Sequence, residues 1–260
     1  TNLLPIIKTL RTTGSKCRVF LFSDEPTIKK YGLIQNFFIP LENCGLEFVN
    51  LGDLNTNDYY YICYLRYYIY KSFLILYRQF FDRIIFMDLY DSIIQHDPFT
   101  TEFGDSLYLS NEGYIMRGDD FNMKCMLKGL KNLKKFNFDY YQRKAIFDGY
   151  IINGGLQEGS ALNLIKLCSL MEESGDVEKK MVFTLDQTFL NIIAYSGYLS
   201  KIVNFTILPK GNDLSSTIGL YAQEMIRNRV PIVFGNISRD GKIPAILHQY
   251  DRYYKIKDEL

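Results

Sequence analysis

The feature that most constrains this chain is an apolar run at residues 84–87 that stops abruptly at Asp88. The run is short, rich in branched and aromatic side chains and free of turn residues, which is typical of a strand buried on both faces of a sheet. Asp91 follows three residues later, and carboxylates beyond the carboxyl end of such a strand lie where open α/β sheets bind ligands. Two such carboxylates can hold a hard divalent cation that carries substrate phosphates. The alternative is that Asp88 caps the next turn and Asp91 is solvated.

Helical and strand patterns alternate along the 260 residues, and this alternation predicts an α/β fold with a parallel, doubly wound sheet. Because the first expected element is a helix that feeds a strand, an upstream strand is a candidate for a missing part of the sheet. We expect helices at residues 2–11, 27–38, 57–80 and 159–173 and from 185 onward, and strands at 18–22, 46–49, 84–87, 105–110, 230–234 and 243–247 and from 149 onward.

The expected helix at residues 57–80 is the longest apolar stretch, and it leads directly into the strand that ends at Asp88. Asn57 or Asp58 can cap it. Three basic residues interrupt it, so we expect no transmembrane segment in this chain. One of the three, Arg66, has two open interpretations: a surface side chain that snorkels into water, or a side chain that enters the site to bind a phosphate.

Three later stretches end or begin with polar residues in the same manner. Residues 149–155 form an apolar strand that runs into Asn153-Gly154-Gly155, where glycines let the backbone approach a ligand or another strand closely. Asp186 and Gln187 begin a helix and can either cap it or reach a polyhydroxylated ligand. The last expected strand ends at His248. An ordinary turn, a helix cap and a structural histidine are the corresponding alternatives.

Composition excludes some classes of function. The chain has 30 Lys and Arg residues and 29 Asp and Glu residues, so it lacks the excess of positive charge that nucleic-acid binding requires. Five scattered cysteines have no metal-ligand or redox spacing and are expected to be free thiols. The polar, lysine-dotted stretch from 119 to 144 is expected to be a solvated face or a mobile insertion.

Localisation has two weak indicators. Residues 257–260 read Lys-Asp-Glu-Leu and match an ER-retention signal, although a chain cut inside a charged helix would look the same. Glycosylation sequons occur at 204–206 and 236–238. Together they favour the ER or Golgi lumen over the cytoplasm.

The order of these motifs resembles the GT-A glycosyltransferases, in the branch around glycogenin and the bacterial lipopolysaccharide galactosyltransferases, and most closely a set of uncharacterised eukaryotic relatives. The resemblance rests on Asp88 to Asp91, on Asp-Pro-Phe at 97–99, on Asn-Gly-Gly at 153–155, on Asp-Gln-x-x-x-Asn at 186–191 and on His-Gln-Tyr-Asp-Arg at 248–252. It covers nearly the whole chain. It implies a single GT-A, Rossmann-like domain over residues 1–260 with a mostly parallel central sheet flanked by helices. The family's first strand, which helps to bind the base, is not evident here.

The resemblance also implies a metal site for Mn²⁺ or Mg²⁺. Asp88 matches the first acid of the family's Asp-x-Asp, which binds the cation and lies near the ribose. The second acid falls on Tyr90, a departure from the pattern, and Asp91 takes the metal role one place later. His248 matches the histidine that completes the metal site.

The remaining matches concern the donor. Arg66 resembles a basic residue that meets the nucleotide or phosphate, and Asn153 with Gly154 matches residues beside the donor sugar. Asp186 and Gln187 match residues that contact sugar hydroxyls. With Glu112, they are candidates for orienting the donor sugar or the acceptor hydroxyl.

The resemblance therefore implies a metal-dependent glycosyltransferase that moves a sugar from a nucleotide-diphosphate donor to a glycan, lipid or protein acceptor, with retention suggested by that branch. A catalytically degenerate nucleotide-sugar or glycan-binding module is the main alternative, because Tyr90 replaces an acid or because the first strand is absent. A divalent-metal phosphohydrolase is a second one, since paired aspartates at a strand end also serve that chemistry.

Overall fold

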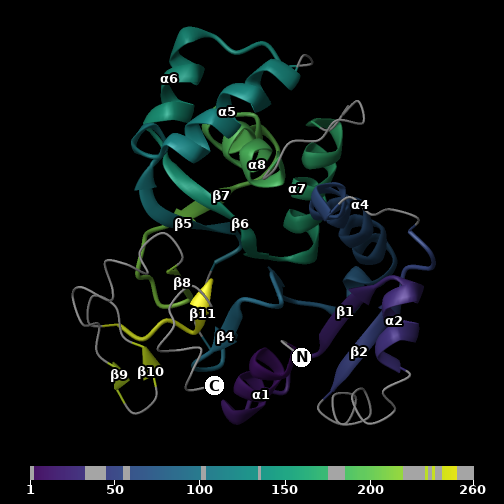
Figure 1. Cartoon of the computed structure of the whole chain (residues 1–260). Coiled ribbons are helices and arrows are strands. Elements are labelled where there is room, and N and C mark those ends of the chain that lie inside the picture. Colours follow the sequence, from purple (N-terminus) through teal and green to yellow (C-terminus); the bar gives the residue numbers. More distant parts are fainter. Residues whose placement is uncertain are drawn as a thin grey trace.

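The computed structural model describes residues 3–32, 45–54, 59–100, 104–133, 136–174, 185–218, 232–233, 236–237 and 242–250 (Figure 1). The α-helices are α1 (Leu3–Thr12), α2 (Glu25–Gly32), α4 (Tyr59–Tyr77), α5 (Asp120–Asn132), α6 (Tyr140–Asp148), α7 (Ala161–Ser174) and α8 (Leu185–Tyr195), with short 3₁₀ turns at Arg78–Phe80, Met116–Gly118 and Leu199–Lys201. The strands are β1 (Val19–Ser23), β2 (Leu46–Asn50), β3 (Ile84–Met87), β4 (Ser92–Ile94), β5 (Leu107–Ile115), β6 (Tyr150–Gly159), β7 (Phe205–Leu208), β8 (Ser215–Thr217), β9 (Ile232–Val233), β10 (Asn236–Ile237) and β11 (Ile246–His248).

The central sheet has the strand order β3-β6-β5-β7. β6 runs antiparallel to both of its neighbours, and β5 and β7 are parallel. The protein is α/β, but the prediction of a mostly parallel central sheet is wrong, because the sheets are mixed. An apolar run indicates that a strand is buried on both faces. A central strand is buried on both faces whether it is parallel or antiparallel to its neighbours, so the run does not indicate strand direction.

Two of the smaller sheets lie next to the central sheet in Figure 1. β1 and β2 form a parallel pair with α2 between them in sequence. β11 lies between β4 and β8, antiparallel to the first and parallel to the second. In Figure 1, β1 and β2 lie beside α4, whereas β4, β8 and β11 lie below the central sheet.

The central sheet lies between two apolar clusters. On one face, Phe86, Leu107 and Ile152 pack with helices α4, α7 and α8. On the other face, Ile85 and Leu156 pack with α1 and with β11. Because consecutive strand residues point to opposite faces, residues 84–87 contribute to both clusters, which explains the apolar run.

The stretch from 119 to 144 contains α5 and part of α6. Its lysines at positions 124, 128, 131 and 144 are exposed, which agrees with the prediction of a solvated face. Asp119 caps α5 by accepting a hydrogen bond from the Asn122 backbone, and Asp139 and Gln142 form a capping box on α6. Both caps satisfy backbone donors that a helix start leaves open. Buried Met126 and Ile146 then attach these helices to the main core.

Several predictions fall on residues outside the described ranges. They are the caps Asn57 and Asp58, the second half of the helix expected at 27–38, Ser238 of one sequon, the pair at 251–252 and the Lys-Asp-Glu-Leu end. The localisation therefore stays a prediction. In the part of the chain that the structure describes, no helix combines the length and apolarity needed to cross a membrane.

Candidate functional site

Asp88 and Asp91 come from the turn that joins two different sheets. Asp88 directly follows β3, and its backbone N–H donates to Gly155 O of β6 at 2.9 Å. Asp91 directly precedes β4. The antiparallel register of β4 and β11 places His248 opposite Ser92, and this pairing brings the last described strand to the two aspartates.

Asp88, Asp91 and His248 converge, as the sequence predicted. Their ligand atoms all lie within 4.8 Å of one another. His248 Nδ1 lies 3.4 Å from Asp91 Oδ1 and 3.0 Å from Ser92 Oγ. The His248 side chain is 1% exposed, whereas those of Asp91 and Asp88 are 24% and 41% exposed. Two partly exposed carboxylates and a buried imidazole form a donor set that suits a divalent cation.

Gly155 makes this convergence sterically possible. A Cβ at position 155 would lie 2.4 Å from Asp88 Oδ2 and 2.9 Å from His248 Cε1. The Asn-Gly-Gly stretch lies inside β6 rather than in a turn after it, so the glycine serves close approach and not chain reversal. This outcome favours the functional interpretation of that stretch over the ordinary turn.

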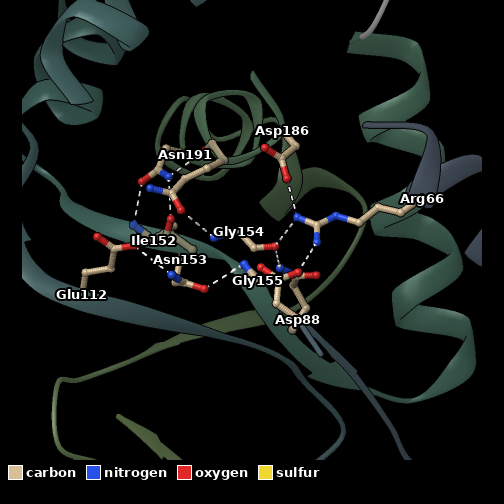
Figure 2. Close-up of polar contacts among 11 residues, drawn as sticks. Arg66, Asp88, Glu112, Ile152, Asn153, Gly154, Gly155, Asp186 and Asn191 are labelled. Carbon is tan, nitrogen blue, oxygen red and sulfur yellow. Dashed lines mark hydrogen bonds and ion pairs between the residues drawn. The ribbon is translucent and has the colours of Figure 1, made fainter. Parts of the chain in front are cut away.

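Arg66 of α4 enters the site instead of snorkelling to the surface. Its guanidinium donates to Asp88 Oδ1 at 2.6 Å, to Gly154 O at 2.8 Å and to Asp186 (Figure 2). The side chain is mostly buried. Of the two interpretations, the structure supports the one in which Arg66 belongs to the site. The partners it holds there are two carboxylates and a carbonyl.

The two carboxylates on Arg66 differ in their titration. Burial raises the pKa of the Asp88 carboxyl, but the Arg66 guanidinium and the His248 ring outweigh it, and the pKa lies below its ordinary value. Burial also raises the pKa of Asp186, and Arg66 offsets only part of that rise, so this pKa lies above its ordinary value. Asp88 is therefore the better anionic ligand of the two.

Asp186 and Gln187, in the first turn of α8, face the same region as Gly154. Gln187 Oε1 accepts a hydrogen bond from the Gly154 backbone N–H at 2.9 Å, and Gln187 Nε2 donates to Asn122 Oδ1 at 3.3 Å. A Cβ at Gly154 would lie 3.0 Å from Gln187 Cβ. The start of α8 is thus packed tightly on β6.

Asn153 and Glu112 form a buried pair behind this surface. Asn153 Nδ2 donates to Glu112 Oε1 at 2.8 Å, and Asn153 Oδ1 accepts from the Gly155 backbone N–H at 2.7 Å (Figure 2). Both side chains are buried. Glu112, a candidate for orienting the donor sugar or the acceptor hydroxyl, is thus buried and holds the Asn153 amide, and its role toward a substrate stays a prediction.

Sequence reasoning gave no role to Ser92 and Asn122, and it used Asn191 only as the last residue of the Asp-Gln-x-x-x-Asn motif. Ser92 Oγ contacts His248, Asn122 contacts Gln187, and Asn191 binds both the backbone N–H and the carbonyl of Ile152 at 2.8 Å. The first two contacts join residues far apart in sequence, which no local pattern encodes. Asn191 had a local signal, because it is a fully buried polar residue on the apolar face of an expected helix.

Comparisons with known proteins find similar solved structures, but no family model and no curated protein matches the chain. Among solved structures, a glycosyltransferase involved in the glycosylation of the major capsid of PBCV-1 aligns with 93% of this chain and 100% of that chain, at 10% identity and a TM-score of 0.45. Likeness at that level transfers no residue role to this chain.

Proposed function

We propose that this chain is a glycosyltransferase that moves a sugar from a nucleotide-diphosphate donor to an acceptor hydroxyl with the help of a divalent cation, Mn²⁺ or Mg²⁺. The observation that carries the proposal is the convergence of Asp88, Asp91 and His248 within 4.8 Å at the end of a core strand. The order of motifs along the sequence supplies the reaction class. The donor set supplies the reason for a metal, because hard cations that carry phosphates take carboxylate ligands and leave other positions to the substrate.

In this proposal Asp88, Asp91 and His248 hold the cation, and the bound cation supplies positive charge against the departing nucleoside diphosphate. Arg66 keeps Asp88 oriented toward the cluster through its 2.6 Å contact. Gly155 leaves the space in which the ligands meet. Asp91 and His248 are fixed by the pairing of β4 with β11, so the site is built on strands rather than on free loops.

The donor sugar in this proposal lies against the start of α8 and the backbone of β6 at Gly154. Asp186 and Gln187 define the shape of that surface, because both are tied to the Gly154 backbone, directly or through Arg66. Asn153 and Glu112 are positioning residues: their buried hydrogen bond fixes the backbone from which Gly154 and Gly155 project.

A catalytically degenerate nucleotide-sugar-binding module is the alternative, and one observation favours it. Tyr90 stands where the second family acid is expected, and its side chain points into solvent, 56% exposed. A module of this kind keeps the cation and the donor but lacks turnover.

The test combines Mn²⁺ calorimetry with a screen of nucleotide sugars for Mn²⁺-dependent hydrolysis and transfer. We expect the wild-type chain to bind Mn²⁺ and to cleave at least one donor. Asp88→Asn is expected to weaken Mn²⁺ binding by about tenfold or more and to remove cleavage. Asp213→Asn is the matched control, because it makes the same chemical change at an exposed aspartate paired with Lys242.

The outcomes separate the candidates. Equal Mn²⁺ binding by wild type and Asp88→Asn contradicts the metal site. Mn²⁺-dependent binding of a nucleotide sugar without turnover supports the degenerate module, and release of inorganic phosphate from simple phosphate esters supports a phosphohydrolase.

A further inference from the structure

His248 lies in a row of three side chains that crosses the small sheet of β4, β11 and β8. The antiparallel register of β4 and β11 pairs His248 with Ser92, and the parallel register of β11 and β8 pairs it with Thr217. Residues that pair in register point to the same face of a sheet, so two hydroxyl groups flank the imidazole. All three side chains are buried. The two hydroxyl groups therefore belong to the fixed surroundings of the ring.

The two hydroxyl groups differ in their contacts. Ser92 Oγ lies 3.0 Å from His248 Nδ1, which is a normal hydrogen-bond length. Thr217 Oγ1 is buried and has no hydrogen-bond partner in the part of the chain that the structure describes. Loss of a buried partner leaves the other group unsatisfied, whereas loss of an unpartnered hydroxyl does not. Of the two, Ser92 is the residue that can act on the ring.

Nδ1 of His248 has one further neighbour, Asp91 Oδ1, at 3.4 Å. This distance is longer than an ordinary N–H···O hydrogen bond. Asp91 is also one of the three proposed cation ligands, and a carboxylate that binds a cation is a weaker acceptor for an imidazole N–H. Ser92 is the neighbour of Nδ1 that lies outside the ligand set. The hydrogen bond from Ser92 is therefore compatible with a bound cation.

The other side of the ring faces Asp88. A Cβ at Gly155 would lie 2.9 Å from His248 Cε1 and 2.4 Å from Asp88 Oδ2, so both of these atoms approach the same point. Nε2 is bonded to Cε1, and no described residue forms a hydrogen bond or an ion pair with Nε2. Of the two ring nitrogens, Nε2 is the one left to bind a cation.

We propose that Ser92 is a positioning residue that holds the His248 proton on Nδ1 and thereby leaves Nε2 as the cation ligand. In a neutral imidazole one nitrogen carries the proton, and the other carries the lone pair that binds a metal. Ser92 Oγ accepts the hydrogen bond from Nδ1–H, which fixes both the tautomer and the orientation of the ring. This inference rests on the proposed cation site and extends it to the choice of ion.

A nitrogen ligand gives the site a preference among divalent cations. Mg²⁺ binds oxygen ligands and gives up its waters reluctantly, whereas ions of the first transition row gain affinity from imidazole. An Nε2 ligand held in place by Ser92 therefore favours Mn²⁺ over Mg²⁺. Removal of the Ser92 hydroxyl is expected to reduce this preference.

The first experiment reads the tautomer in the metal-free protein, so it does not depend on a bound cation. The chain has two histidines, and ¹⁵N NMR of histidine-labelled protein at alkaline pH distinguishes a ring N–H from a bare nitrogen, with His96→Ala to assign the signals. We expect wild-type His248 to carry its proton on Nδ1. Ser92→Ala is expected to give a mixture of both tautomers. Thr217→Val is the matched control, because it removes a buried hydroxyl from the same row without a contact to Nδ1, and it is expected to keep the wild-type tautomer.

The second experiment compares the calorimetric affinities for Mn²⁺ and Mg²⁺. Ser92→Ala is expected to weaken Mn²⁺ binding by about tenfold and to change Mg²⁺ binding much less, so that the ratio of the two affinities falls. A merely structural role of Ser92 would weaken both ions alike. Thr217→Val is expected to keep both affinities.

Three results would overturn the proposal. They are a wild-type His248 that carries its proton on Nε2, the same tautomer in wild type and Ser92→Ala, and an equal loss of Mn²⁺ and Mg²⁺ affinity in Ser92→Ala. Failure of the wild-type protein to bind Mn²⁺ would instead contradict the proposed cation site, and with it the choice of ion. The tautomer in the metal-free protein reports on Ser92 alone and keeps the two failures distinguishable.

Discussion

Arg66 neutralises two carboxylates that belong to different elements of the fold. Asp88 follows β3 and Asp186 lies in the first turn of α8, and both contact the same guanidinium. The planar fork of arginine suits this task, because it presents several donors in fixed directions. Removal of one member of a buried ion pair leaves the others uncompensated, and that loss is larger than the net contribution of the pair.

We predict that Arg66→Met lowers the free energy of unfolding by roughly 3 kcal/mol, because Asp88 and Asp186 then face each other without a cation. Arg18→Met is the control: Arg18 pairs with Glu47 in a largely exposed contact, and its loss is expected to cost much less stability, because water screens exposed ion pairs. Urea denaturation of both variants measures the difference. Equal losses of unfolding free energy in the two variants would show that the Arg66 contacts stabilise the fold no more than the exposed Arg18 contact does.

Glu158 of β6 is a second buried carboxylate, and it contacts Arg83. Burial raises the pKa of the Glu158 carboxyl to about 7, although the Arg83 guanidinium lowers it in part. The folded state therefore binds this proton more tightly than the unfolded state does. The stability from this group is fully present below the ordinary carboxyl pKa and is lost as the pH rises through about 7.

We predict that Glu158→Gln flattens the fall in stability between about pH 5 and pH 8, because the amide keeps an acceptor for Arg83 and carries no titrating proton. Chemical denaturation at a series of pH values measures the effect. Glu47→Gln serves as the control, since Arg18 lowers the pKa of Glu47 and its contribution is lost as the pH falls instead. An unchanged pH profile in Glu158→Gln would contradict the assignment.

At the scale of elements, β6 organises the site. It pairs with β3 and β5 through its backbone, carries the buried amide of Asn153 and receives the start of α8 at Gly154. Gly155 then passes directly beneath Asp88 and His248. A strand that does all of this in three consecutive residues tolerates little added volume.

We predict that Gly155→Ala weakens Mn²⁺ binding by about 10- to 100-fold and costs only about 1 kcal/mol of stability. The new methyl group meets the end of the Asp88 side chain first, so the carboxylate moves rather than the backbone. Gly118→Ala is the control, because a Cβ there meets nothing within 4 Å. Calorimetric Mn²⁺ titration and thermal melts separate the two effects. Intact Mn²⁺ affinity in Gly155→Ala would place the metal elsewhere.

At the scale of the whole molecule, the candidate metal site joins distant parts of the chain. Ser92 and His248, which touch through their side chains, are 156 residues apart in sequence. β4 and β11 meet there, and the cluster of α1 with β11 supports them from below. A cation at this point stabilises the folded state alone, because the ligands are not assembled in the unfolded chain.

We predict that Mn²⁺ at about 100 times its Kd raises the Tm by about 5 °C or more, from a linkage free energy of about 2.7 kcal/mol. His248→Ala is expected to abolish this shift. His96→Ala, a change at the second of the two histidines, is expected to retain it, because His96 contacts the Ile243 carbonyl and lies outside the cluster. Calorimetry with and without Mn²⁺ measures the Tm shift of each variant. A shift that persists in His248→Ala would contradict the proposed metal site.

The sequence alone determined the local elements and most of the residues that make up the candidate site. The run at residues 84–87 predicted β3 and its exit at Asp88, and helical spacing predicted α1, α4, α7 and α8 with small shifts at their ends. These features depend on neighbours a few residues away, and burial leaves a periodic trace in the sequence. The convergence of Asp88, Asp91 and His248 followed from motif order and is present in the structure.

Only the tertiary structure decided strand direction, register and the partners of charged groups. The antiparallel course of β6, the pairing of His248 with Ser92, the two carboxylates on Arg66 and the burial of Glu112 behind Asn153 are all contacts between distant segments. An apolar run records that a strand is buried but not which way its neighbour runs. An arginine in an apolar helix likewise does not indicate which residues its side chain contacts. These choices depend on the free energy of the packed chain as a whole, which no local pattern contains.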